Sequence, residues 1–132
     1  MDAPAWRFEI ADSAGALHKR EDFMAYLRAC NAVGDFAAAE LIFGELVSNA
    51  MIHAPGPIGV SVEWLEGHAT LHVFDGGLPL DVSVVTEAAD VFDEHGRGLA
   101  IVQGLAPAPG VVVDNAYTQG KTVSVELPIH LG

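Results

Sequence analysis

The sequence predicts an α/β two-layer domain in which helices cover one face of a mostly antiparallel sheet. Three observations support this fold class: an alternating apolar pattern opens the chain, two stretches with helical spacing follow, and two β-rich runs come next, joined by a short connection. The expected order β, α, α, β, β, lid, α, β, β fits helices packed together on one side of the strands. Because 132 residues suffice for one core, we expect residues 1–132 to form a single domain.

The first part of the chain is expected to hold one strand and two helices. Apolar and charged residues alternate over residues 6–10, which is the period of a half-buried strand. Helical spacing extends over about residues 14–31, with Ser13 as the expected N-cap. Asp35 can cap a second helix over about residues 36–53, which a Pro-Gly-Pro run ends.

The second part is expected to hold a hairpin, a loop, a helix and two last strands. Residues 58–65 and 68–74 are β-rich and only two residues apart, which indicates a hairpin. Residues 76–95 show no clean period, so we expect a mobile loop there that could act as a lid. An apolar helical stretch follows, and the last strands are expected at 111–113 and 121–127.

Composition limits the possible partners and the location of the protein. Eighteen acidic residues against six Lys and Arg give a formal net charge of -12, which repels nucleic-acid backbones and anionic lipids. Cys30 is the only cysteine, so an internal disulfide is excluded. The sequence shows neither the apolar core of a signal peptide nor a membrane-spanning run. We therefore expect a cytoplasmic protein without direct nucleic-acid or membrane binding.

The first candidate site motif, ELVSNAMIHAP, spaces Glu45, Asn49 and His53 four residues apart, so that they share one helix face. Oxygen ligands suit Mg²⁺, so Asn49 is a candidate metal ligand, and Glu45 could take a proton from an attacking hydroxyl or water. Alternatively, both are solvated polar residues on the outer side of an amphipathic helix. His53 is better interpreted as an end-of-helix residue that complements the dipole, and it stays a weak site candidate.

A second motif, VFDGG, places a carboxylate where an apolar strand ends. Asp75 could accept a hydrogen bond from an exocyclic amine such as adenine N6. Gly76 and Gly77 would let a flat base approach the backbone. The alternative is an ordinary Asp-Gly turn.

A third motif, HGRGLAIV, places Gly96 and Gly98 immediately before an expected helix. Free amides and the positive end of the helix dipole form an anion site suited to phosphates, and Arg97 could add charge. A helix start of purely structural role is the alternative.

The last motif, QGKTVSVEL, places Thr122 at the start of a strand that could pass beneath Asp75 and offer it a hydroxyl. By itself this motif indicates only a hairpin. Each of the four motifs is ambiguous alone, but their order and spacing together are much less expected by chance.

These motifs resemble the GHKL (Bergerat-type) ATPase superfamily, which includes gyrase, heat-shock chaperone, histidine kinase and mismatch-repair ATPases. ELVSNAMIHA resembles the N box, FDGG the first glycine box and HGRGLAIV the second. The compact size and the ending GKTVSVELP resemble the stand-alone serine kinases that act as bacterial anti-sigma factors. The resemblance extends over about residues 6–128 and implies the Bergerat fold.

The resemblance also implies roles for individual residues and for ligands. It implies ATP and Mg²⁺ as cofactors, Asn49 as the Mg²⁺ ligand and Glu45 as the catalytic base. It also implies Asp75 and Gly77 at adenine and Gly96 and Gly98 at the phosphates, while Thr122 matches the family's threonine near the base. One departure is Pro79, which stands where the first glycine box has another glycine. A proline there stiffens the lid hinge, which is expected to affect lid closure and turnover more than nucleotide binding.

Kinases of this kind phosphorylate a serine of a small antagonist (anti-anti-sigma) protein, and in an alternative complex they sequester a sigma factor, commonly as homodimers. We expect this partner-switching activity here. Two alternatives stay open: a non-catalytic ATP-binding regulatory module, and the detached ATP-binding domain of a sensor histidine kinase. For the latter a phosphoacceptor helix would be expected upstream, but His18 is followed by charged residues and is interpreted as a surface histidine.

Overall fold

The computed structural model describes residues 6–53, 56–77, 94–115 and 120–132, and the structural statements below refer to them. The elements in chain order are β1 (Trp6–Ile10), α1 (Ser13–Ala29), β2 (Ala32–Gly34), α2 (Phe36–His53), β3 (Ile58–Leu65), β4 (His68–Asp75), α4 (Glu94–Leu105), β5 (Val111–Asn115) and β6 (Lys121–Leu131). Within these ranges no helix is long and apolar enough to cross a bilayer.

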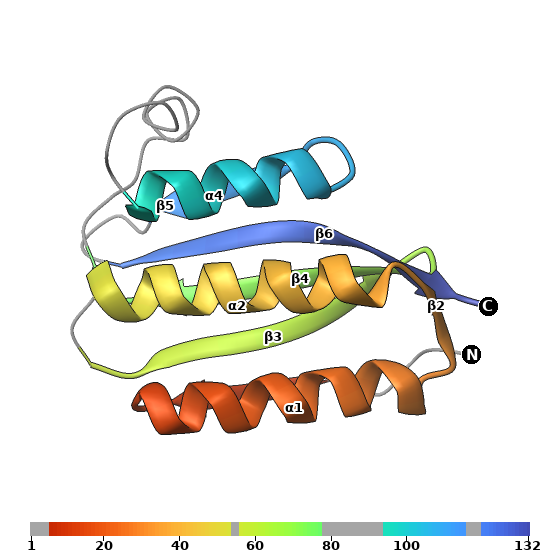
Figure 1. The fold of residues 1–132 in the computed structure, drawn as a ribbon, viewed down its shortest axis with the longest axis horizontal. Helices are drawn as coiled ribbons and strands as arrows, with labels where there is room; N and C mark the ends of the chain where they lie inside the picture. Colours follow the sequence, from red (N-terminus) through yellow and green to blue (C-terminus); the bar gives the residue numbers. More distant parts are fainter. Residues whose placement is uncertain (1–5, 54–55, 78–93, 116–119) are drawn as a thin grey trace.

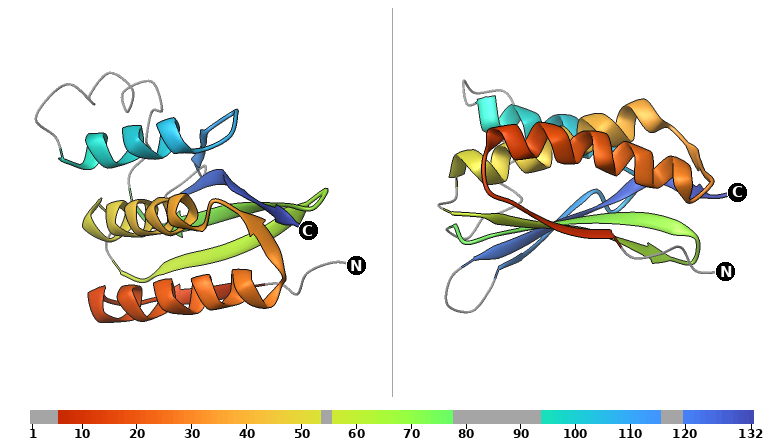
Figure 2. Two further views of the ribbon diagram at one scale, coloured as in Figure 1. Left: turned by 45° about the vertical axis from the view of Figure 1, so that its right-hand side comes forward. Right: turned by 90° about the horizontal axis from the view of Figure 1, so that it is seen from below.

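The strands form one antiparallel sheet with helices on one face. The strand order is β1-β3-β4-β6-β2, and β5 pairs with β6 on the same side as β2. Helices α1, α2 and α4 cover one face of this sheet (Figure 1), and Figure 2 shows the two layers from below. The predicted fold class is therefore confirmed.

The core lies between the two layers, because each strand alternates between a buried and a more open face. Along β4, Ala69, Leu71 and Val73 are buried, whereas Phe74 is 48% exposed. The helices contribute the other half of the core, and its largest fully buried side chains are Phe23, Phe43, Ile10, Leu27, Ile42, Ile58, Leu71, Leu127 and Ile129. This alternation decides which residues can reach a site between the layers.

Helix α2 has the predicted bounds because its start is capped as expected. The Asp35 carboxylate accepts a hydrogen bond from the Ala38 backbone N–H at 3.0 Å. For α1 the predicted cap is wrong by one residue: Asp12 is the N-cap and accepts from the Gly15 N–H at 2.7 Å, while Ser13 is already helical. Asp and Ser are equally good caps, so the sequence alone could not choose between them.

The predicted hairpin is confirmed, and its two-residue connection explains its register. Glu66 and Gly67 have φ of 52° and 80°, as a two-residue turn with both central residues left-handed requires. Among the strands, β2 was missed, β5 continues to Asn115 instead of ending at Val113, and β6 continues to Leu131 instead of ending at Leu127. The predicted lid segment lies mostly outside the described residues.

The second glycine motif is placed differently from the prediction. Helix α4 begins at Glu94, so Gly96 and Gly98 lie inside its first two turns and do not precede it. A glycine within a helix costs only about 1 kcal/mol, which the helix can absorb when neighbouring residues pack well. Leu99 and Val102 of α4 are buried against the core.

Candidate functional site

Four element ends meet at one end of the molecule. The last turns of α2, the start of α4, the end of β4 and the start of β6 lie together, on the left in Figure 1, and both views in Figure 2 agree. Strand pairing fixes part of this arrangement, since Asp75 at the end of β4 is directly opposite Lys121 at the start of β6. The motifs that sequence reasoning singled out are therefore gathered at this end.

Asp75 is the best-defined member of the site. It is fully buried at 0% exposure and points to the helix-facing side of the sheet, like the buried Val73 two residues before it. Its Oδ1 accepts from the Gly77 backbone N–H at 2.8 Å and from the Lys121 ammonium at 2.8 Å. Its Oδ2 has no hydrogen-bond partner among the described residues. A buried carboxylate oxygen without a donor is costly, so this atom is suited to accept an N–H from a ligand.

Glu45 and Asn49 lie one turn apart on α2. Gly44, Ser48 and Met51 line a groove of about 430 Å³ between α2 and α1. At about 100° per residue, Asn49 turns away from that groove, whereas Glu45 lies on the same face as Ile52, which also lines it. Helix α4 packs on the side of α2 away from α1 (Figure 1), and the side chains of Glu45 and Asn49 are both half-buried. The carboxylate and the amide therefore lie on one ridge of α2, with the amide on the side nearer to α4.

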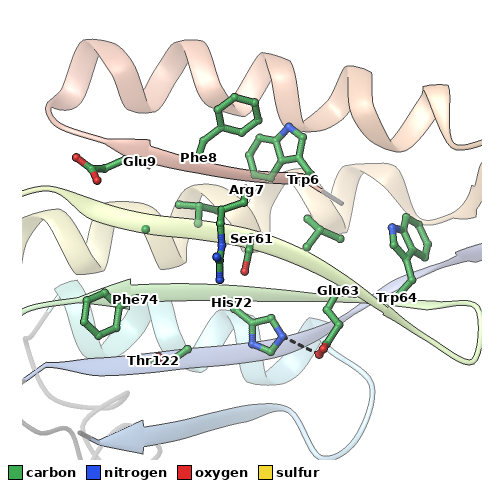
Figure 3. A pocket seen from close by; sticks show the side chains of 13 residues that line it. Trp6, Arg7, Phe8, Glu9, Ser61, Glu63, Trp64, His72, Phe74 and Thr122 are labelled. Atoms are coloured by element: carbon green, nitrogen blue, oxygen red, sulfur yellow. Dashed lines mark hydrogen bonds and ion pairs between the residues drawn. The ribbon is translucent and has the colours of Figure 1, made fainter. Parts of the chain in front are cut away.

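Thr122 is not brought to Asp75, which corrects the predicted placement. It pairs with Phe74, and Figure 3 shows it beside Phe74 and His72 on the sheet face away from the helices. Because strand side chains alternate, the neighbour of Asp75 on β6 is the preceding residue, Lys121. Thr122 therefore has no described contact with the candidate site.

Lys121 was missed by sequence reasoning, although the strand pattern contained a signal for it. It precedes Val123 and Val125 at intervals of two, so it shares their buried, helix-facing side. Its side chain is 4% exposed and forms an ion pair with Asp75. A charged residue on the buried side of a strand calls for a partner, and the nearest candidate was the carboxylate at the end of β4.

For the remaining predicted site residues, the structure describes the position of the backbone only. Gly77 is buried and its carbonyl accepts from the Gly120 N–H at 3.2 Å, which links the ends of β4 and β6. Gly96, Arg97 and Gly98 lie in the first two turns of α4, and His53 is the last residue of α2. The side chains of Arg97 and His53 lie outside the described part of the structure.

A broad groove of about 1080 Å³ lies elsewhere, on the open face of the sheet. Figure 3 shows its polar members, among which His72 contacts the Ser124 hydroxyl at 2.6 Å and Glu63 at 3.1 Å. Of the predicted site residues only Thr122 lines it. This groove is therefore separated from Asp75 by the sheet itself.

The described residues contain no group of three or more His, Cys, Asp or Glu side chains that could hold a metal ion. A magnesium ion held by the Asn49 amide oxygen, waters and nucleotide phosphates does not need such a group. The donor set that Glu45 and Asn49 form on α2 is hard oxygen, which fits Mg²⁺ and not a soft metal.

The fold and the gathered motifs define a nucleotide-dependent class of protein. The chain belongs to the family described as histidine kinase-, DNA gyrase B- and HSP90-like ATPases, which matches residues 34–131. This confirms the GHKL resemblance.

Solved structures agree with this fold. The catalytic domain of histidine kinase ThkA is similar with a TM-score of 0.58 and 17% identity, over 93% of this chain and 97% of that one. Acinetobacter baumannii histidine kinase AdeS is similar with a TM-score of 0.52 and 12% identity, over 97% of this chain and 68% of that one. No curated protein matches the chain.

Proposed function

We propose that the chain binds ATP with Mg²⁺ and transfers the γ-phosphate to a serine of a small antagonist protein, and that it sequesters a sigma factor in an alternative complex. The observation that carries ATP binding is the fully buried Asp75, whose Oδ2 accepts no hydrogen bond from the residues that the structure describes, at the place where the site elements meet. An adenine N6 amine is a donor that satisfies this atom. Membership of an ATPase family supports the same ligand.

Each residue of the proposed site has a distinct task. Asp75 and the buried Gly77 hold the base, Asn49 holds the ion, and the first turn of α4, which contains Gly96 and Arg97 and is followed by Gly98, faces the phosphates. ATP supplies the phosphoryl group and Mg²⁺ neutralises charge on the phosphate oxygens. Glu45, one turn before Asn49, accepts the proton of the attacking serine hydroxyl.

The partners follow from the charge and the resemblance to stand-alone anti-sigma-factor kinases. A net charge of -12 suits basic protein surfaces and opposes direct contact with DNA. We further propose that the protein is cytoplasmic and acts as a homodimer that switches between an antagonist and a sigma factor. It acts on transcription through these proteins.

A second candidate function is the ATP-binding domain of a sensor histidine kinase. Two similar solved structures are histidine kinases, which favours this alternative at the level of the fold. The two functions differ in the product, because phosphoserine survives acid treatment and phosphohistidine does not. A third possibility is a regulatory module that binds ATP without transfer.

Glu45→Ala separates transfer from binding, because a general base acts mainly in the transition state. The variant should bind Mg-ATP normally, while label transfer from γ-³²P-ATP to the serine-bearing antagonist should fall by a factor on the order of 10²–10⁴. Binding is measured by calorimetry and transfer by acid-stable label on the partner. Glu40→Ala on an exposed side of α2 is the matched control and should transfer like the unmodified protein.

Two outcomes would contradict the kinase proposal. If the unmodified protein bound ATP but labelled no serine partner, the non-catalytic module would replace it. If the label appeared but was acid-labile, the histidine kinase function would replace it.

A further inference from the structure

Lys121 occupies a place in the site that none of the predicted roles uses. We propose that Asp75 and Lys121 form one donor–acceptor pair that reads the purine base, and that this pair admits 6-oxopurine nucleotides such as ITP and GTP as well as ATP. This inference rests on the proposed function, since it concerns the base of the nucleotide bound there. It makes Lys121 a specificity-determining residue.

The contacts of the pair leave both an acceptor and donors unused. Oδ1 of Asp75 is satisfied twice, by Lys121 Nζ and by the Gly77 N–H, both at 2.8 Å. Oδ2 accepts nothing among the described residues. An ammonium has three N–H donors, and the single described bond of Lys121 uses one of them. Within the described part of the chain, an acceptor without a donor and donors without an acceptor therefore lie side by side.

Burial makes these unused groups consequential. Asp75 is 0% exposed and Lys121 is 4% exposed, so water does not satisfy them freely. A buried polar group gains most from a ligand that supplies its missing partner, and it rejects a ligand that leaves it unpaired. The base that suits this pair must therefore present a donor beside an acceptor.

Adenine and 6-oxopurines both present such an edge, but in opposite order. Adenine has the N6 amine as a donor next to the N1 acceptor, whereas hypoxanthine and guanine have the O6 acceptor next to the N1–H donor. A carboxylate alone would accept from adenine N6 and would repel O6. With Lys121 beside it, a 6-oxopurine whose edge is reversed relative to adenine can accept at O6 from the ammonium while its N1–H donates to Oδ2. The pair thus removes the discrimination that Asp75 would provide alone.

Strand geometry holds the two side chains together. Asp75 and Lys121 are direct cross-strand partners on β4 and β6, and both lie on the buried side of the sheet. Gly120 precedes Lys121 with φ of +100°, and a side chain there would meet the Asp75 carbonyl at 2.9 Å. The backbone that carries Lys121 is therefore close to Asp75 before any side chain is considered.

The test compares dissociation constants for Mg-ATP and Mg-ITP by calorimetry at one salt concentration. ITP differs from ATP at positions 1 and 6 and lacks the 2-amino group of guanine, so it isolates the predicted contact. The unmodified protein should bind ITP within about tenfold of ATP. In Lys121→Met the ratio Kd(ITP)/Kd(ATP) should rise on the order of 10-fold or more, because O6 loses its donor and faces a carboxylate.

Lys19→Met is the matched control. Lys19 is the other lysine of the chain, and its ammonium lies on α1, 3.4 Å from Asp22. Its loss should leave the ratio unchanged. Far-UV circular dichroism of each variant checks that it is folded. If Lys121→Met does not fold, the ratio Kd(ITP)/Kd(ATP) of the unmodified protein still tests whether the site admits ITP.

Three results would overturn the proposal. One is exclusion of ITP by the unmodified protein by more than about 100-fold. Another is a Lys121→Met variant whose affinities for ATP and ITP change by the same factor. Lys121 would then only fill space or stabilise the fold, without reading the base. The third is an absence of binding to either nucleotide, which would overturn the proposed function as well, whereas ATP binding with exclusion of ITP overturns this inference alone.

Discussion

At the scale of single residues, the Asp75–Lys121 ion pair affects stability as well as the proposed recognition of the base. Both groups are almost fully buried and their charged atoms are 2.8 Å apart. Two buried charges lose their hydration, and their attraction roughly offsets this cost only while both are present. The pair is therefore a weak source of stability when intact and a strong source of instability when one member is missing.

This asymmetry predicts the outcome of a double-mutant cycle. Asp75→Asn keeps the acceptor for the Gly77 N–H but leaves the Lys121 ammonium without a counter-charge, so it should lower the free energy of unfolding by about 3–5 kcal/mol. The double variant Asp75→Asn with Lys121→Met should recover most of this loss, because no buried charge is then unpaired. Urea denaturation of the four proteins measures the cycle.

Equal and additive losses in the cycle would contradict the coupling and would mean that the two side chains act independently. The far-surface variant Glu66→Gln, in the exposed turn of the β3–β4 hairpin, serves as a control and should change stability by no more than about 0.5 kcal/mol.

The difference between Thr122 and Lys121 shows what the sequence could predict at this scale. The position of Asp75 at the end of an apolar run was predictable, and it is buried there. Its neighbour on β6 was predicted wrongly as Thr122, because a hydroxyl is a chemically suitable partner for a carboxylate. The period of two along the strand instead assigns Lys121 to the buried side. A shift of one residue in a strand exchanges the two faces, so a correct strand can still give the wrong contact.

At the scale of elements, prediction succeeded where one local signal was strong and failed where tertiary packing decides. Helix α2 was predicted within its observed bounds because Asp35 caps it and a Pro-Gly-Pro run follows. Strand β2 has three residues, too few for a periodic pattern, and it exists because it pairs with Ile129, His130 and Leu131 of β6. The start of α4 was missed because glycines usually signal an end or a loop.

Gly34, at the end of β2, is the element-scale feature with the clearest consequence. It has φ of +138°, and a Cβ placed there would collide with the Pro128 carbonyl oxygen on β6. Gly34→Ala should therefore destabilise the protein by more than the about 1 kcal/mol by which glycine and alanine usually differ, because both the backbone conformation and the close approach of two strands are lost. Thermal unfolding measures the loss.

Gly104→Ala is the matched control for Gly34→Ala. Gly104 lies within α4, and a Cβ there would meet nothing within 4 Å. This substitution should raise the free energy of unfolding by about 0.5–1 kcal/mol, because alanine is the better helix former. Opposite signs for the two variants are expected, and a stable Gly34→Ala protein would contradict the packing of β2 on β6.

At the scale of the whole molecule, the part of the chain before the family match is built into the core. The match begins at residue 34, whereas β1 and α1 precede it. Trp6 of β1 is 6% exposed. The centroid of its ring lies 5.8 Å from the ring centroid of Phe23 in α1 and 6.1 Å from that of Phe43 in α2. Phe23 and Phe43 stack on each other at 4.6 Å. These rings join residues outside the family match to the helix that carries Glu45 and Asn49.

Trp6→Ala should therefore act on the whole molecule. Loss of a buried Trp costs about 3–5 kcal/mol, a large share of the about 5–15 kcal/mol that stabilises a domain of this kind. Because the cluster connects β1, α1 and α2, the loss should shift one cooperative transition and should not melt β1 and α1 separately. Urea unfolding followed by circular dichroism and by Trp64 fluorescence should give coincident midpoints, both lowered.

Phe8→Ala on the same strand is the control: Phe8 is 38% exposed, and its loss should cost only about 1 kcal/mol. Two separated transitions in Trp6→Ala would show that the N-terminal elements fold apart from the nucleotide-binding part. ATP affinity measured below the first transition would then be unchanged, whereas a cooperative fold predicts that affinity is lost together with the structure.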